Sequence, residues 1–128
     1  LADSPVGQMA WILEKFWSWV DHRGDPRDVV DIDRLLDNVM VYWLTNSAGS
    51  SARLYWESFK DLDVREIHVP TGISSFPGEI FRTSSRWAEK RFTDLRHFGI
   101  LERGGHFAAF EQPELFISEV RTAFSSMR

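Results

Sequence analysis

The chain has no cysteine, no long uncharged apolar run and no excess of positive charge. Without cysteine, a disulfide framework, a thiolate nucleophile and a zinc–cysteine site are all excluded. A membrane-spanning helix needs roughly 18 uncharged apolar residues in a row, and no stretch approaches that length. The net charge of −4 gives no basic surface for nucleic acid or anionic lipid. We therefore expect a cytoplasmic protein that binds no nucleic acid and contributes no membrane segment.

Apolar and aromatic residues are abundant instead. The 128 residues are 43% hydrophobic and 14% aromatic, which is enough for one ordinary core. Six tryptophans and ten phenylalanines exceed what a small solvated fold needs, and they favour a large interior or an apolar cavity. The sequence opens at Leu1, directly on what looks like a helix entrance. We therefore expect the chain to be part of a longer protein.

The first half of the chain predicts three helices. Apolar residues recur at helical spacing over about 5–22 and again over 31–45. A Gly- and Pro-containing loop separates these two segments. A polar break then precedes a third helical segment, 52–59, for which Ser50 or Ser51 is the expected N-cap.

The second half predicts strands that alternate with helices. Apolar and polar residues alternate in two short segments, and serine or proline marks the start of each following helix. The expected order is a strand at 65–70, a loop at 71–79, a helix from Ser84 or Ser85, a strand at 95–101, a loop, and a helix from Pro113. These are two βα units, which normally belong to a parallel sheet with helices on both faces. Two strands cannot form such a sheet, so the remaining strands are expected outside this chain.

The segment RGGHFAAFEQP contains the first candidate functional residue. His106 lies on the loop five residues after Leu101, beyond the carboxyl end of the expected last strand. Active sites of open α/β sheets gather on such loops, and Gly104 and Gly105 allow a sharp turn. His106 is therefore either a catalytic base or a polar residue that forms hydrogen bonds across a tight loop. The other histidines have no such setting and receive no role.

A catalytic histidine usually needs a carboxylate to orient its ring. Glu79 in SSFPGEIF lies on the loop after the preceding strand, and loops that follow neighbouring parallel strands can meet. The alternative is that Glu79 caps or solvates a helix start. Glu111 is a weaker candidate for the partner, because a carboxylate at that position is better suited to the N-terminus of the following helix.

Five motifs in order resemble one enzyme family. They are DSPVGQMAWILEKFW, LLDNVMVYWLT, SSARLYWES, VPTGISSFPGEIF and RGGHFAAFEQPELF. Together they are similar to the C-terminal part of an epoxide hydrolase of the microsomal type, which has the α/β-hydrolase fold. The resemblance implies an α/β fold in which residues 1–62 form helices of a lid. Residues 63–128 then supply the last two βα units of the parallel sheet.

The resemblance also implies roles for three residues. His106 matches the family's base, Glu79 matches the carboxylate that holds this base, and Tyr55 matches one of two tyrosines that project from the lid. The nucleophilic aspartate and the second tyrosine lie upstream of these motifs in the family. Such enzymes hydrolyse an apolar epoxide with water to a vicinal diol and use neither a metal nor an organic cofactor. The isolated chain is accordingly expected to be inactive.

Without the resemblance, Tyr55 is a helix tyrosine packed beside Trp56. The aromatic helix at the start of the chain could line an apolar substrate pocket with Trp11 and Phe16, or these two residues could be plain core. A fragment with two strands would expose a broad apolar face. We therefore expect it to associate with itself or with the missing N-terminal half.

Two other interpretations remain open at this point. The parent could be another α/β-hydrolase, such as a dehalogenase or an esterase, although these chemistries do not require a phenol at the leaving oxygen. Alternatively, the chain could be an interaction module that has kept the sequence of the family without its activity.

Overall fold

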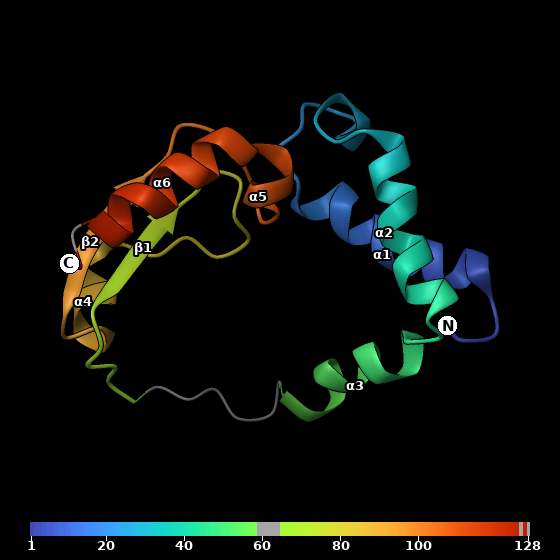
Figure 1. The fold of residues 1–128 in the computed structure, drawn as a ribbon, viewed down its shortest axis with the longest axis horizontal. Helices are drawn as coiled ribbons and strands as arrows, with labels where there is room; N and C mark the ends of the chain where they lie inside the picture. Colours follow the sequence, from blue (N-terminus) through green and yellow to red (C-terminus); the bar gives the residue numbers. More distant parts are fainter. Residues whose placement is uncertain (59–64, 126, 128) are drawn as a thin grey trace. The chain divides into compact units, whose positions relative to one another are not determined.

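The computed structural model describes residues 1–58, 65–125 and 127. The chain forms two compact units. The first unit contains Leu1–Ser18 and His22–Asp63, and the second contains Trp19–Asp21 and Val64–Arg128. The short segment 19–21 therefore packs with residues that lie far away in the sequence. Figure 1 shows the elements of both units in the order of the chain.

The first unit is helical. Helix α1 (Pro5–Trp19) buries Gln8, Ile12 and Phe16, which are spaced four residues apart and share one face. The helix ends three residues earlier than the apolar period suggests, because the following residues leave the helix to pack in the second unit. A 3-10 turn, η1 (Pro26–Asp28), follows in the loop.

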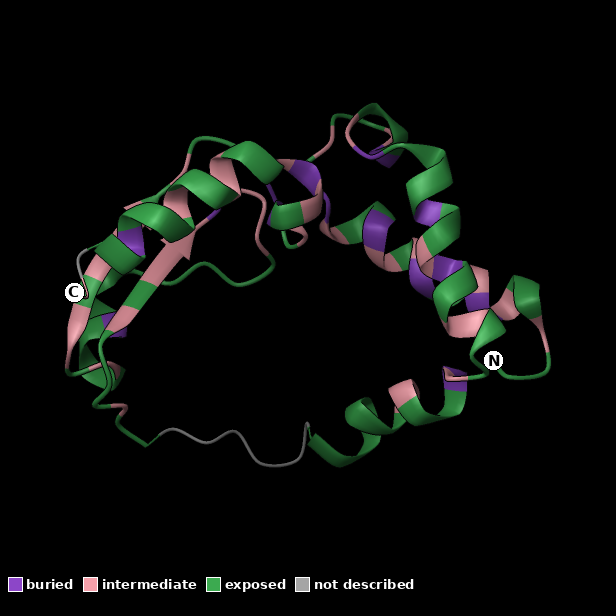
Figure 2. Ribbon diagram, viewed as in Figure 1, coloured by how far each residue is buried: buried purple, intermediate pink, exposed green. Residues whose placement is uncertain are grey.

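Helix α2 (Ile32–Leu44) matches the expected segment closely. Asp31 caps its N-terminus, where the N–H of Asp33 donates to Asp31 Oδ1 at 2.8 Å. Leu35 and Val39 form its buried face. Figure 2 shows that the buried residues of α1 and α2 lie along one side of each helix, as expected for amphipathic helices.

Helix α3 (Ala48–Ser58) begins earlier than predicted, and the predicted N-cap is wrong. Ser50 and Ser51 both lie inside the helix. Their hydroxyls donate to the carbonyls of Ser47 and Ala48, at 3.0 Å each, instead of accepting from the first N–H groups. Serine side chains can satisfy themselves in this way within a helix, so their position alone does not mark its start.

The second unit contains a two-stranded parallel sheet of β1 (Thr71–Ser75) and β2 (Leu95–Ile100). The parallel pairing and the second strand were expected. The position of the first strand was wrong, because residues 71–75 form the strand and residues 65–70 contribute only a single bridge, Ile67 to Phe92. The reason is packing, since Gly72 lies directly under Ala123 and Met127, where a Cβ atom would approach their side chains to 3.0 and 3.1 Å.

Three helices complete the second unit. The hydroxyl of Ser84 caps α4 (Ser85–Arg91), accepting from Trp87 N–H at 3.4 Å. The one-turn helix α5 (Ala108–Glu111) leads into α6 (Pro113–Ser125), which begins at the predicted proline and packs on both strands (Figure 1).

One side chain of α6 reaches the sheet through polar contacts. Glu119 accepts a hydrogen bond from Ser74 Oγ of β1 at 3.2 Å and contacts Nε2 of His97 on β2. The His97 and Glu119 side chains are only 18% and 13% exposed. This cluster joins the helix to both strands. No helix among the described residues has the length and apolar character needed to cross a membrane.

Candidate active site

The loops after the two strands are joined by a parallel bridge between two glycines. Gly78 follows β1, Gly105 follows β2, and the two form an isolated parallel bridge in which the N–H of Gly78 donates to the carbonyl of Gly104 at 2.9 Å. Residues that directly follow bridged partners in a parallel pair lie side by side. The residues that follow these glycines are Glu79 and His106.

Glu79 and His106 are in direct contact. Nδ1 of His106 lies 2.7 Å from Oε1 of Glu79, and the side chains are 40% and 30% exposed. An ionised carboxylate can only accept, so Nδ1 carries the hydrogen and Nε2 is left to accept a proton. The N–H of Ile80 also donates to Glu79 Oε1 at 2.7 Å. The carboxylate is therefore held by the backbone as well as by the imidazole.

The glycines of the histidine loop are required by close contacts. A Cβ atom at Gly105 would lie 2.5 Å from the carbonyl oxygen of Trp19 and 2.8 Å from the N atom of Asp21. Both are backbone atoms that cannot rotate away. Gly104 has φ = +107°, a conformation that L side chains rarely adopt. The loop can therefore pass this closely beside residues 19–21 only with glycine at these positions.

Glu111 accepts hydrogen bonds from the backbone of the same loop. It is a buried carboxylate, 6% exposed, at the end of α5. Its Oε2 accepts from the N–H groups of Asp21 at 2.9 Å and Gly105 at 2.8 Å, and its Oε1 accepts from Phe107 N–H at 3.0 Å. All three of these hydrogen bonds come from backbone N–H groups of Asp21 and the histidine loop, so Glu111 is not the partner of the His106 ring, and its effect on the start of α6 stays a prediction.

Segment 19–21 supplies the remaining contacts. The N–H of His106 donates to the carbonyl of Trp19 at 2.9 Å, and the N–H of Gly104 donates to Asp21 Oδ2 at 2.9 Å. The Trp19 ring meets the imidazole edge to face, with centroids 5.0 Å apart. The Trp19 ring also stacks on the Phe107 ring, with centroids 6.2 Å apart. His106 is thus held through its backbone, through Nδ1 and through an aromatic neighbour.

Comparison with known proteins shows what this chain is similar to. No protein-family model matches the chain. A protein of Stigmatella aurantiaca (strain DW4/3-1), whose name places it among epoxide hydrolases, is 50% identical over an alignment of 129 positions that covers all of this chain and 29% of that protein. Pig (Sus scrofa) epoxide hydrolase 1 is 38% identical over 94% of this chain and 29% of its own length. Over nearly its whole length, the chain is therefore similar to a C-terminal part of epoxide hydrolases.

The structural comparison agrees with that assignment. The crystal structure of juvenile hormone epoxide hydrolase from the silkworm Bombyx mori superposes on 99% of this chain with a TM-score of 0.85 and 34% identity. The match covers 33% of that structure. The chain therefore spans about a third of the epoxide hydrolases it matches and has the fold of a C-terminal portion of an α/β-hydrolase. These matches favour the epoxide hydrolase interpretation over a dehalogenase or an esterase.

The remaining predicted site residues lie in the first unit. Tyr55 is on α3 and is 43% exposed, and its ring meets that of Trp11 edge to face at 5.6 Å. Trp11 is 38% exposed, and Nζ of Lys15 lies 4.3 Å from the centroid of its ring. Phe16 is buried in the α1 face. The roles of Tyr55 in catalysis and of Trp11 and Phe16 in substrate contact stay predictions.

Sequence reasoning missed two contributors to the site, Trp19 and Asp21, and it named Glu111 without finding that it holds the histidine loop. Trp19 and Asp21 lie more than 80 residues before the loop that they hold, and nothing local marks them. The signal for Glu111 was available. An acidic residue at the end of the apolar run HFAAF has to be exposed or paired, because a buried charge needs hydrogen-bonding partners.

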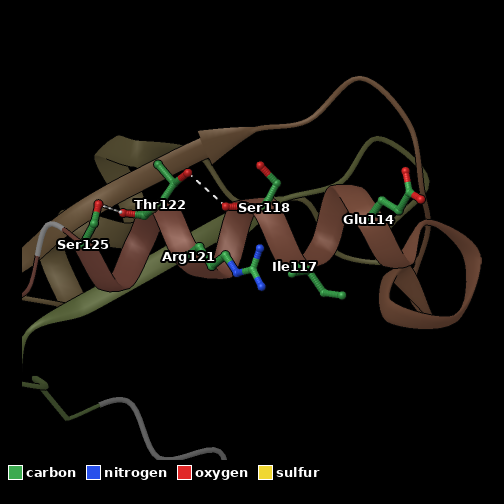
Figure 3. A pocket seen from close by; sticks show the side chains of 6 residues that line it. All are labelled: Glu114, Ile117, Ser118, Arg121, Thr122 and Ser125. Carbon is green, nitrogen blue, oxygen red and sulfur yellow. Dashed lines mark hydrogen bonds between the residues drawn. The ribbon is translucent and has the colours of Figure 1, made fainter.

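A hollow on the surface lies away from these residues. Its volume is about 540 Å³, and α6 alone lines it, with Glu114, Ile117, Ser118, Arg121, Thr122 and Ser125 (Figure 3). None of the predicted site residues lines it. Within the described part of the chain, no cluster of three or more histidine and acidic side chains is arranged to hold a metal ion.

Proposed function

We propose that this chain carries the base of an epoxide hydrolase and that His106 and Glu79 act together in the hydrolytic half of the reaction. The contact of 2.7 Å between His106 Nδ1 and Glu79 Oε1, beyond the carboxyl ends of adjacent parallel strands, is the observation that carries this proposal. It orients the ring so that Nε2 is the nitrogen that can take a proton.

The first step of the proposed reaction forms an ester. An aspartate carboxylate supplied by the upstream part of the enzyme attacks an epoxide carbon, and the carbon–oxygen bond of the ring breaks. The leaving oxygen takes a proton from a phenol, for which Tyr55 is the candidate in this chain. The product is a hydroxyalkyl ester of the aspartate, with a phenolate left on the tyrosine.

The second step uses the residues of the second unit. Nε2 of His106 takes a proton from water, and the resulting hydroxide attacks the carbonyl carbon of the ester. The tetrahedral intermediate breaks its bond to the alkyl oxygen, which takes the remaining proton of the added water and leaves as the second hydroxyl of a vicinal diol, so that the aspartate is again a carboxylate. Glu79 balances the charge of the imidazolium, whose proton returns through solvent or product to the phenolate. The net reaction consumes one epoxide and one water.

We further propose that the chain functions only in association, either with the upstream part of such an enzyme or with another copy of itself. Large apolar side chains of the second unit are strongly exposed, among them Phe81 at 87% and Ile100 at 76%. An isolated sheet of two strands is marginally stable at best in water. Covering these side chains would remove apolar area from water, at about 25 cal/mol for each Å².

A hybrid enzyme tests the proposed function. In this hybrid, the chain replaces the matching C-terminal segment of the Stigmatella aurantiaca relative. With styrene oxide as the probe, we expect the hybrid to form the diol, and the upstream part and the chain alone to form none. Diol production is measured by chromatography.

The outcome also separates the alternatives. A folded hybrid that consumes no epoxide contradicts the proposal and favours a module without activity. A hybrid that hydrolyses a nitrophenyl ester but no epoxide would favour the esterase interpretation. Circular dichroism shows whether the hybrid is folded. If it is not, the upstream part of the relative and this chain are purified separately and mixed, and diol formation is measured in the mixture.

A further inference from the structure

We propose that Glu111 is a positioning residue for the reaction: its buried carboxylate fixes the His106 backbone at the distance from Glu79 at which the imidazole can act. This inference rests on the proposed function, because it concerns the hydrolytic step assigned to His106. The hydrogen bonds of Glu111 go to backbone N–H groups and not to the imidazole, so its action is indirect.

The position of the three N–H groups carries the inference. Glu111 accepts from Gly105 and Phe107, the residues immediately before and after His106, at 2.8 and 3.0 Å. The Phe107 N–H belongs to the peptide group that follows His106, and the peptide group that precedes His106 carries the N–H that donates to the Trp19 carbonyl. The Gly105 N–H belongs to the peptide group one residue farther back, so Glu111 holds the loop on both sides of the His106 N–H and leaves little rotation about the backbone bonds between these groups. One carboxylate therefore restrains the direction in which the His106 side chain leaves the chain.

The third hydrogen bond connects the loop to segment 19–21. The N–H of Asp21 donates to Glu111 Oε2 at 2.9 Å, and this oxygen is the one that also accepts from Gly105. The carbonyl of Trp19 in turn accepts from the N–H of His106. Glu111 and segment 19–21 thus hold the loop from two directions. The Gly78–Gly105 bridge then sets the distance to Glu79.

The chemistry of the side chain explains why glutamate is needed here. A carboxylate has two oxygens with about four acceptor sites, and three N–H donors point at Glu111. Glutamine has the same shape but only one acceptor oxygen. Its amide N–H₂ would face at least one of the three donors, which would leave that N–H unpaired in a buried position.

The test measures the two steps of the reaction separately in the hybrid enzyme. Glu111→Gln is compared with Glu114→Gln, an exposed glutamate on the first turn of α6. Ester formation and ester hydrolysis are followed by intact-protein mass spectrometry after rapid mixing with styrene oxide. For Glu111→Gln we expect ester hydrolysis to slow by about 10- to 100-fold, the range expected when a reacting group is displaced by about 1 Å, while ester formation is unchanged. The control should change neither rate.

A purely structural role gives a different result. Loss of folded protein lowers both rates by the same factor and leaves their ratio unchanged, and that outcome overturns the proposal. So does an unchanged rate of hydrolysis in a folded variant. If the parent hybrid makes no diol, the proposed function fails instead, and the two failures are therefore distinct.

A second variant covers the possibility that Glu111→Gln does not fold. Asp21→Ala removes the acceptor of the Gly104 N–H at an exposed residue and keeps the Cβ that packs against Gly78. A selective slowing of ester hydrolysis in this variant supports the positioning of the loop through segment 19–21 and Glu111. Equal slowing of both steps, or no slowing, counts against it.

Discussion

Two histidine–glutamate contacts at hydrogen-bonding distance in the second unit differ in almost everything except residue type. His106 and Glu79 lie on loops beyond the strands, 40% and 30% exposed, and Nδ1 makes the contact. His97 and Glu119 lie between the sheet and α6, 18% and 13% exposed, and Nε2 makes the contact. The pair of residue types therefore does not define a catalytic site.

The difference lies in which ring nitrogen remains for chemistry. His106 engages its acid through the nitrogen nearer the backbone, which leaves the outer nitrogen for a proton from water. His97 engages Glu119 through the outer nitrogen, and Glu119 also accepts from Ser74. We propose that the first pair moves protons, whereas the second attaches α6 to the sheet. The following predictions compare the two pairs, all in the hybrid enzyme.

The largest difference is expected between the two histidines. His106→Gln should slow ester hydrolysis by about 10²- to 10⁴-fold, the usual contribution of general acid–base catalysis, so that the ester accumulates. His97→Gln should leave the rate for each folded molecule unchanged and lower the melting temperature instead. Intact mass spectrometry detects the ester and calorimetry the melting. Equal loss of activity in both variants would remove the distinction.

Substitutions of the two glutamates should also separate activity from stability, with a smaller loss of activity than for the histidines. Glu79→Gln should lower kcat by about 10²-fold, since a neutral partner no longer stabilises the imidazolium, the role that the acid of a catalytic triad plays. Glu119→Gln should lower the free energy of unfolding by about 1–3 kcal/mol, as expected for a disturbed buried hydrogen bond, with kcat retained. Steady-state kinetics and denaturant titration measure the two effects, and a stability loss in Glu79→Gln without a kcat change would contradict them.

Substitution of alanine for the glycine near each pair, Gly105→Ala and Gly99→Ala, compares how well the surroundings of the two pairs accept an added Cβ atom. At Gly105 the new Cβ meets backbone atoms of Trp19 and Asp21, whereas at Gly99 it overlaps the carboxylate of Glu119, a side chain that can move. Both variants should lose stability within the range of about 1–3 kcal/mol typical of overpacking, with Gly105→Ala at the upper end and also slowed in ester hydrolysis. Urea unfolding ranks the variants, and the reverse order would show that the loop yields more readily than α6.

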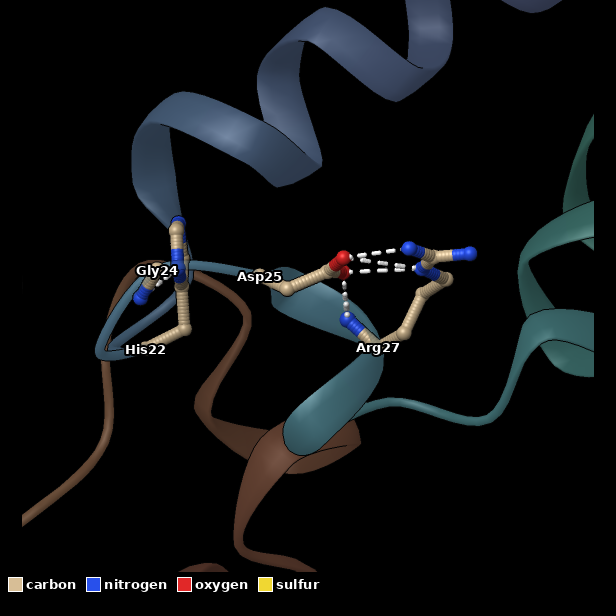
Figure 4. A network of polar contacts seen from close by, with 4 residues as sticks. All are labelled: His22, Gly24, Asp25 and Arg27. Carbon is tan, nitrogen blue, oxygen red and sulfur yellow. Dashed lines mark hydrogen bonds and ion pairs between the residues drawn. The ribbon is translucent and has the colours of Figure 1, made fainter.

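The smallest effect is expected at an exposed ion pair that belongs to neither site. In the loop of the first unit, hydrogen bonds from Arg27 lower the pKa of Asp25 from 3.8 to about 2 (Figure 4). Because the pKa is depressed by folding, any stabilisation is present above pH 3.8 and is lost as the pH falls through about 2.

Arg27→Gln should therefore raise the pKa of Asp25 toward 3.8 and leave stability at neutral pH unaltered, as is usual for exposed pairs. Arg23→Gln, an exposed neighbour in the same loop, is the matched control. NMR titration of the carboxyl carbons gives both values. A melting temperature that falls at neutral pH in Arg27→Gln alone would mean that the pair supports the fold.

The sequence predicts those parts of the fold that depend on local patterns. Apolar periodicity predicts α2 well, and Ser84 and Pro113 correctly mark helix starts. The contact of Glu79 with His106 follows from the rule that loops after parallel strands meet. Their roles in catalysis remain predictions, as does the role of Tyr55.

The rest depends on contacts between distant residues. Strand β1 has a composition typical of a loop, in part because side chains pack closely on Gly72. These side chains belong to Ala123 and Met127, which lie about 50 residues farther along the sequence. The sequence indicates that Glu111 needs hydrogen-bonding partners, but no local pattern reveals that one of them is Asp21, 90 residues away. Side chains that bind distant backbone groups leave almost no pattern in their own neighbourhood.

The bridge between Gly78 and Gly105 suggests a way to recognise the acid in divergent relatives. Because each member of the pair follows its bridged glycine by one residue, the lengths of the segments between strand and glycine can vary without changing their alignment. An alignment anchored on the strands would then misplace the acid. A search for an acidic residue directly after a glycine, where that glycine pairs with the glycine before the histidine, would find the acid.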